Sequence, residues 1–289
     1  MSLPSACLWN AGARAPLYLK GAVLRTETNM LHAKPTLRTF AILAAVLFAI
    51  GTPIAQTLMG VIAVGRGDLV NDGNQTLEAA GYAFSIWGVI YLGLLAYAGY
   101  QALPSTEETP GLRRLGWPSV IAMAGCGAWL IAASADAKWA TVAIISASAL
   151  ALCVPLLKRY PVQRRIEFWL VAAPLSLLAG WLTVASAINL LTVLTSFDII
   201  RPHTAPAWAA SGVGAVMAIG LGITVTAKNW VYPLPIAWGL AGVAVAEQAD
   251  RPMIALLAAG AALALLAAAA WAGTHKRILV PLSSQGDSI

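Results

Sequence analysis

Long apolar runs are the feature of this sequence that most constrains its fold. A helix needs about 20 apolar residues to cross a hydrocarbon core about 30 Å thick, because its backbone polar groups must be satisfied within the segment. Turns that contain Pro, Gly, Asp or basic residues separate the runs. We therefore predict an all-α, polytopic membrane helix bundle of about eight transmembrane helices, at 39–62, 82–102, 117–135, 138–157, 166–192, 205–226, 231–248 and 252–273.

Composition excludes a soluble fold of this size. Hydrophobic residues make up 59% of the chain and charged residues only 10%, whereas a soluble domain has about 25% charged residues. The molecular surface must therefore face lipid, and the bilayer is the first predicted partner. The net charge of +6 does not indicate nucleic acid, because the basic residues form no stripe with interleaved aromatic residues.

The positions of Lys and Arg predict the orientation, because these residues resist translocation when they lie in short loops. Alternate loops hold fourteen of them on one side and four on the other. This asymmetry predicts that both termini are cytoplasmic. The larger set is Arg14, Lys20, Arg25, Lys34, Arg38, Arg113, Arg114, Lys158, Arg159, Arg164, Arg165, Lys228, Lys276 and Arg277; the smaller is Arg66, Lys138, Arg201 and Arg251.

The two ends of the chain have different compositions from the apolar runs. Residues 1–38 are basic and contain no apolar run followed by a cleavage site, so we predict a disordered N-terminal segment rather than a signal peptide. Met30 stands shortly before the first run, and translation starting there is a further hypothesis. Residues 274–289 are predicted to form a cytoplasmic tail.

The sequence supplies no catalytic or metal-binding pattern, and we expect neither an enzyme nor a required cofactor. No Ser/His/Asp set, metal spacing or phosphate loop is present. Cys7, Cys126 and Cys153 form no CxxC pair and are interpreted as small core residues. Five charged residues fall at predicted helix ends, where we interpret them as solvated at the interface: Asp136, Lys138, Glu167, Glu247 and Asp250.

Eleven tryptophans are present, and most fall at helix ends, where indole rings commonly mark the membrane interface. Four others lie at a similar depth in the predicted outer half of the bundle: Trp87, Trp129, Trp139 and Trp181. Tyr91 shares a helical face with Trp87, while Ala185 and Asn189 follow Trp181 at intervals of four. These residues line a ligand pocket or, alternatively, are ordinary packing aromatics.

Two of these segments resemble signatures of the tryptophan-rich sensory protein and translocator protein family (TspO/MBR, the peripheral benzodiazepine receptor). The first is Phe84-Ser-Ile-Trp87-Gly-Val-Ile-Tyr91, which is similar to the family pattern W-x-x-[LI]-Y. The second runs from Trp181 to Asn189, with the family's Trp-to-Asn spacing of eight and a small residue, Ala185, between them. Trp129 and Trp139 resemble the tryptophans of the family's third and fourth helices.

The resemblance covers residues 40–192 and implies a TspO/MBR-like five-helix domain at 39–192, followed by an additional three-helix region at 193–273. Its implied ligand is a tetrapyrrole such as a porphyrin or haem, another hydrophobic pigment, or a sterol-like or carotenoid-like molecule. The implied site residues are Trp87, Tyr91, Trp129, Trp139, Trp181, Ala185 and Asn189, covered by the loop 63–80, with Tyr82 and Phe84 as a lid. The family's Trp- and Pro-containing loop after the first helix is absent here.

We thus expect a receptor or carrier for a hydrophobic planar ligand, in the bacterial plasma (inner) membrane. A secondary transporter is the main alternative, with Pro53, Pro155, Pro174, Pro233 and Pro235 marking flexible breaks. A structural subunit of a membrane complex is another. A homo-oligomer is a further expected partner. The Gly- and Ala-rich helices after residue 193 can pack closely against other helices, and a separate hypothesis is that they replace the family's dimer contact.

Overall fold

The computed structural model describes residues 37–60, 76–103, 109–157 and 165–274, and the regular secondary structure in this part of the chain is helical throughout. The predicted N-terminal segment, the Met30 hypothesis, the predicted tail and most of the loop 63–80 lie outside the described residues. The elements are α2 Leu37–Leu58, η1 Gly81–Ser85, α5 Ile86–Gln101, α6 Pro110–Ser134, α7 Lys138–Leu157, α8 Arg165–Glu167, η3 Phe168–Ala172, α9 Ala173–Ser196, α10 Ala205–Ala227, α11 Pro233–Glu247 and α12 Pro252–Thr274.

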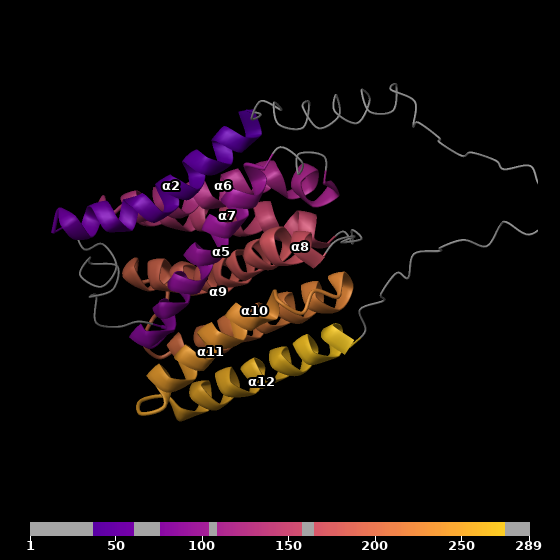
Figure 1. The fold of residues 1–289 in the computed structure, drawn as a ribbon. Coiled ribbons are helices and arrows are strands. Elements are labelled where there is room, and N and C mark those ends of the chain that lie inside the picture. Colours follow the sequence, from indigo (N-terminus) through magenta and orange to yellow (C-terminus); the bar gives the residue numbers. More distant parts are fainter. Residues whose placement is uncertain (1–36, 61–75, 104–108, 158–164, 275–289) are drawn as a thin grey trace, which may run out of the picture.

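These elements confirm the predicted polytopic bundle. Seven described helices are long and apolar enough to cross a membrane, counting η1 with α5 and α8, η3 and α9 as one span. The remaining apolar helix, α11, is shorter than these seven, because its 15 residues extend about 22 Å. It is shorter than the predicted 231–248 because Pro233 and Pro235 confine its start and the chain turns after Glu247. The start of α2 and the end of α12 lie on the same side of the bundle (Figure 1).

The third helix begins at Pro110, before the predicted start at 117. Proline suits the first turn of a helix, and the carboxylate of Glu167 accepts a hydrogen bond from the Gly111 N–H at 2.8 Å. Glu167 is 1% exposed. The interpretation of Glu167 as an interfacial, solvated residue is therefore wrong: it satisfies the N-terminus of a neighbouring helix. The polar first turn of α6 is stabilised by this hydrogen bond.

A tight hairpin joins α6 to α7, as the short spacing predicts. Only three residues separate the two helices, and Asp136 has a φ of 51°. Aspartate is among the few residues other than glycine that adopt this left-handed conformation readily. The Ala137 N–H then donates to the carbonyl of Ala132 at 2.9 Å and completes the turn.

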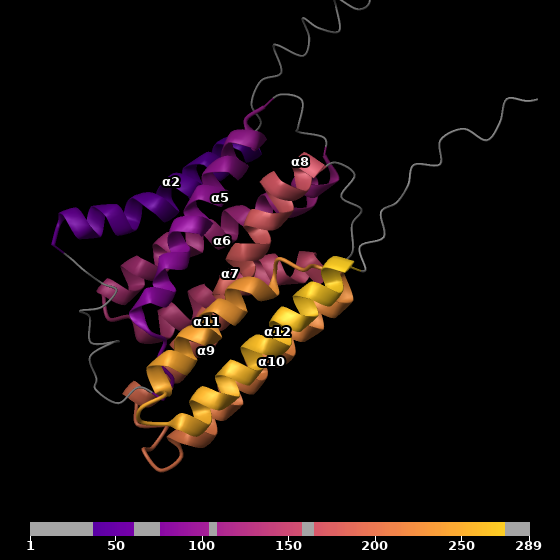
Figure 2. The same cartoon turned by 60° about the horizontal axis from the view of Figure 1, so that its bottom comes forward.

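Helix α9 is the centre of the bundle. It contacts α5, α7, α10 and α11, with α2, α6 and α7 on one side and α10, α11 and α12 on the other (Figures 1 and 2). Before α9, the chain makes the π-helical turn η3, and Pro174 follows it directly. A proline lacks the N–H that would continue the regular ladder. Gly93 of α5 brings that helix against the Pro174 ring, with its missing Cβ 3.2 Å away.

The helices after residue 193 share a core with the first five. One cluster of buried side chains extends from Ile42 of α2 to Leu265 of α12. Tyr232, just before α11, is 0% exposed, and its hydroxyl lies 2.8 Å from that of Thr183 on α9. A Cβ on Gly180 would collide with the Tyr232 carbonyl. The predicted boundary at 192 therefore separates stretches of sequence whose side chains pack together.

Helix α2 is bent part-way along its length (Figures 1 and 2). Pro53 lies inside it and cannot donate to the carbonyl four residues earlier, which is a common cause of helix bends. Beyond the bend α2 remains on α6, because Gln56 donates to the Leu130 carbonyl at 3.2 Å and to the Ser134 hydroxyl at 2.8 Å. The bend therefore leaves space on the side of α2 that faces α5.

Candidate ligand-binding site

Four aromatic side chains contact one another between the start of α5 and the middle of α9. We call this end of the bundle the outer end, following the orientation predicted from Lys and Arg. The Trp181 ring lies 6.3 Å from that of Trp87 and 6.0 Å from that of Phe84, both edge to face. The rings of Trp87 and Tyr91 are 5.1 Å apart. We call these four residues the aromatic cluster. Such geometry stabilises aromatic pairs beyond their buried area.

The positions of the four residues along η1, α5 and α9 explain why their rings lie together. Trp87 and Tyr91 are one helical turn apart on α5, and Phe84 precedes them in the 3₁₀ turn η1. Trp181 on α9 is only 4% exposed, so its ring is held firmly by its surroundings. The small Gly239 of α11 packs against it, with a missing Cβ 3.5 Å from the indole ring. The cluster is therefore rigid at Trp181 and more open toward α5.

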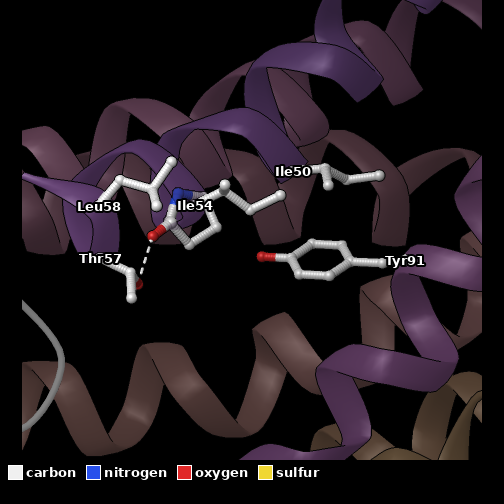
Figure 3. A pocket seen from close by; sticks show the side chains of 6 residues that line it. Ile50, Ile54, Thr57, Leu58 and Tyr91 are labelled. Carbon is white, nitrogen blue, oxygen red and sulfur yellow. Dashed lines mark hydrogen bonds between the residues drawn. The ribbon is translucent and has the colours of Figure 1, made fainter.

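A pocket of about 320 Å³ lies next to the cluster, between α5 and the bent half of α2. Its lining residues are Ile50, Pro53, Ile54, Thr57, Leu58 and Tyr91. Figure 3 shows Tyr91 extending from α5 toward Ile54 of α2 with its hydroxyl group leading. Tyr91 belongs to both the pocket and the cluster. Ile54 is 54% exposed and Leu58 82% exposed, so the pocket is open on the side that faces lipid.

Thr57 places a hydroxyl at the pocket, but that group is occupied. It donates to the Pro53 carbonyl of its own helix at 2.8 Å, as hydroxyls in membrane helices often do. The pocket wall is thus apolar, with the Tyr91 phenol as its main polar group. Such a site favours a hydrophobic ligand with few hydrogen-bonding groups.

Two of the predicted site tryptophans stand apart from the cluster. Trp139 is 50% exposed and stacks on Phe197, with ring centres 5.8 Å apart. It therefore joins the end of α9 to the start of α7. Trp129 packs against the main core, and in the described part of the structure its buried indole N–H has no hydrogen-bond acceptor. Among the ring pairs of the described residues, neither Trp129 nor Trp139 contacts Trp87 or Trp181.

Asn189 and Ala185 lie on α9, on the outer side of Trp181. The Asn189 amide donates to the Thr141 hydroxyl of α7 at 3.0 Å, and the side chain is 8% exposed. The amide therefore joins two helices. Ala185 is half-buried and packs against the core. Thr141 has no motif of its own, so the sequence offered no sign of this pair.

The predicted lid residues Tyr82 and Phe84 have different contacts. Phe84 belongs to the aromatic cluster, whereas Tyr82 packs edge to face on Trp238 of α11, 5.5 Å away. The Trp238 indole N–H donates to the Ala83 carbonyl at 2.9 Å. The segment that carries both lid residues is therefore attached to α11.

A family model described as TSPO-like protein matches residues 38–271. The chain belongs to the TSPO-like protein family. The match extends beyond residue 192 and includes α10, α11 and α12, which the motif resemblance did not reach. No curated protein and no solved structure shows significant similarity to the chain. Family membership, together with the apolar helices, establishes an integral, multi-pass membrane protein of the TspO type.

Residues of α11 pack against the segment beside the candidate site, and no sequence motif had pointed to them there. Trp238 and Gly242 of α11 pack against Tyr82 and Ala83. Glu247, at the end of α11, is 2% exposed and accepts a hydrogen bond from the Glu78 N–H at 3.0 Å. The interpretation of Glu247 as a solvated interfacial residue is wrong, because a backbone donor and Arg251 occupy its carboxylate. The sequence held a signal for two of the pocket residues: Tyr91, which belongs to the W-x-x-[LI]-Y motif, and Pro53, a proline within an apolar run.

Proposed function

We propose that this TSPO-like protein is a membrane receptor or carrier that binds a hydrophobic planar ligand, by family resemblance a tetrapyrrole, between α2, α5 and α9. The observation that carries the proposal is the shared position of Tyr91, which lines the apolar pocket and continues the cluster of Phe84, Trp87 and Trp181. Flat aromatic faces next to a cavity favour a flat ligand, because stacking adds to the burial of apolar surface.

The size and opening of the pocket refine the proposal. A volume of about 320 Å³ is at the lower end of the usual range for small-molecule sites. It suits one edge of a large planar ring, with the remainder of the ring in lipid. Trp87 and Tyr91 supply the stacking faces, and the Tyr91 hydroxyl supplies a neutral hydrogen bond that orients the ligand. Binding without catalysis is the proposed activity, in the bacterial plasma membrane.

A porphyrin titration of the purified protein in detergent tests this proposal. Trp87→Leu removes a stacking ring at a half-buried position, and we expect affinity to fall about tenfold, which corresponds to about 1.4 kcal/mol. The shift of the porphyrin absorption band is the readout, since it does not depend on the protein's own tryptophans. Trp208→Leu on α10 is the matched control, because Trp208 is 40% exposed and lies on a helix that does not line the pocket.

Equal affinities of the wild-type protein and Trp87→Leu would contradict the proposed site. A fall of the same size in Trp208→Leu would show that porphyrin binds indole rings at the membrane surface and not in the pocket. Thermal unfolding of both variants establishes that the bundle is intact.

Secondary transport is the second candidate, favoured by the irregular backbone of the bundle. Pro53 bends α2 beside the pocket, and the π-helical turn η3 precedes Pro174 in the central helix. Such irregularities often occur at functional sites. Gradient-dependent flux of porphyrin into liposomes that contain the protein would favour transport, while binding without flux would favour the receptor.

A further inference from the structure

The segment 76–85 follows α11 closely at the outer end of the bundle. Three positions of α11 contact it in reverse order: Trp238 donates to the Ala83 carbonyl, the Gly242 carbonyl accepts from the Ala80 N–H at 3.0 Å, and Glu247 accepts from the Glu78 N–H. The two backbones thus run antiparallel over the outer half of α11. Gly242 permits this approach, because a Cβ there would lie 2.7 Å from that of Ala83.

An ion pair completes the attachment beyond the end of α11. Arg251 Nε lies 2.6 Å from Glu247 Oε2, and Arg251 Nη2 donates to Glu247 Oε1 at 2.8 Å. The same guanidinium donates through Nη1 to the Thr76 carbonyl at 2.6 Å. The ion pair therefore holds the segment at two backbone groups, Thr76 C=O and Glu78 N–H. Hydrogen bonds that involve charged groups are stronger than neutral ones.

Burial makes these contacts costly to break. Glu247 is 2% exposed, and its carboxylate would lose the Glu78 N–H donor, while keeping Arg251, if the segment moved away. Leu77, between the two tethered residues, is 2% exposed and belongs to the main core. The Thr76 hydroxyl lies 2.6 Å from that of Thr195 on α9. A buried carboxylate that loses a hydrogen-bond donor is destabilised, so this contact, the burial of Leu77 and the Thr76–Thr195 hydrogen bond together favour the closed position of the segment.

We propose that Glu247 and Arg251 form a latch through which α11 keeps the segment 76–85 closed over the outer end of the bundle. The segment ends with η1, which contains Phe84, and Trp87 follows in the first turn of α5. The latch therefore also sets the positions of these two rings relative to Trp181. Release of the latch frees the start of α5 and opens the aromatic cluster from the outer end. Its effect on ligand exchange rests on the proposed function, whereas the latch itself is a property of the fold.

Hydrogen exchange of the ligand-free protein, followed by mass spectrometry of peptides covering 76–85, tests the latch. We expect Glu247→Ala to speed exchange in these peptides about tenfold, the loss expected for one charge-assisted hydrogen bond, while peptides of α7 are unchanged. Asp250→Ala is the matched control, because Asp250 is an exposed carboxylate in the same turn. Exchange in Asp250→Ala should equal that of the wild-type protein.

Trp238→Phe provides a second test if Glu247→Ala loosens the whole bundle. It keeps a smaller aromatic ring against Tyr82 and removes the N–H that donates to the Ala83 carbonyl. Faster exchange confined to 76–85 supports the latch. Unchanged exchange in Glu247→Ala would overturn it, and so would bundle-wide faster exchange in Glu247→Ala together with unchanged exchange in Trp238→Phe.

Porphyrin dissociation, measured by stopped-flow absorbance, tests the consequence for the site. We expect about tenfold faster dissociation from Glu247→Ala than from Asp250→Ala, since the outer end opens more often. Equal rates would show that ligand leaves between α2 and α5, without passing the latch, and would overturn its role in exchange. If the wild-type protein binds no porphyrin, the proposed function fails while the exchange experiment still decides the latch.

Discussion

Asn189 illustrates how one residue can match a family motif and have its hydrogen bonds directed elsewhere. Its spacing from Trp181 is part of the resemblance, yet the amide pairs with Thr141 on α7 and is 8% exposed. The side chain therefore contributes to helix packing in this structure. Tyr91 is the opposite case, because its ring extends into the pocket and its hydroxyl points toward α2 (Figure 3).

A double-mutant cycle measures the Asn189 contribution. Thr141→Val and Asn189→Ala each remove one partner of the hydrogen bond, and we expect a coupling of about 0.6 kcal/mol, the usual value between membrane helices. The measurement is the free energy of unfolding in mixed detergent. Additive effects of the two substitutions would show that the pair contributes nothing to packing. Because the pair lies outside the pocket, the porphyrin affinity of Thr141→Val should stay near that of the wild-type protein.

At the scale of elements, close helix approach depends on particular glycines. Gly180 of α9 faces the chain just before α11, where the Tyr232 carbonyl and the Pro235 ring occupy the space that a Cβ would need. The Tyr232 hydroxyl then reaches Thr183 one turn further along α9. This contact joins the later helices to the central one. Gly214 of α10, in contrast, has open space around it.

Gly180→Ala should lower the free energy of unfolding by about 1–3 kcal/mol, because the added methyl group overfills a packed contact with backbone. Gly214→Ala is the control, and it should be neutral or slightly stabilising because alanine is the better helix former. Thermal unfolding in detergent distinguishes the two variants. Equal melting temperatures would contradict the packing described here for α9 and α11.

At the scale of the whole molecule, the eight apolar helices of the described residues form one unit, in which α2 begins and α12 ends on the same side. A single buried cluster joins α2 to α12, and α9 contacts helices from both parts of the sequence. The start of α2 and the end of α12 lie on the same side (Figure 1), which agrees with eight crossings if the shorter α11 crosses together with the seven long helices. The assignment of that side to the cytoplasm is a prediction from the distribution of Lys and Arg.

Cysteine labelling tests this topology in a background where Cys7 is replaced by serine. Cys126 and Cys153 are buried and should not react. We expect an impermeant maleimide to label Asp250→Cys when it reaches the outer face, and to label Ser283→Cys only after the membrane is permeabilised. The reverse pattern would invert the orientation and place the latch on the cytoplasmic side.

The class of protein and the number of helices could be predicted because they depend on local properties. A sufficiently long apolar run has few stable conformations other than a helix in lipid, since its backbone N–H and C=O groups must form hydrogen bonds within the segment. The tight turn at Asp136 and the shared face of Trp87 and Tyr91 also followed from short-range spacing, whereas Trp181 was placed near them by its predicted depth and by the family resemblance. Glu167 shows the limit of such reasoning, because its partner at Gly111 is distant in sequence.

The tertiary structure alone decided which residues from different helices meet. Most helices here are apolar on all sides, so the sequence shows no polar face that would reveal how each helix is rotated. Trp139 could thus turn to Phe197 and away from the aromatic cluster, and Glu247 could turn inward to the Glu78 N–H. Sequence by itself determined that the chain crosses the membrane as helices; helix rotation and tilt, set by packing, determined the site.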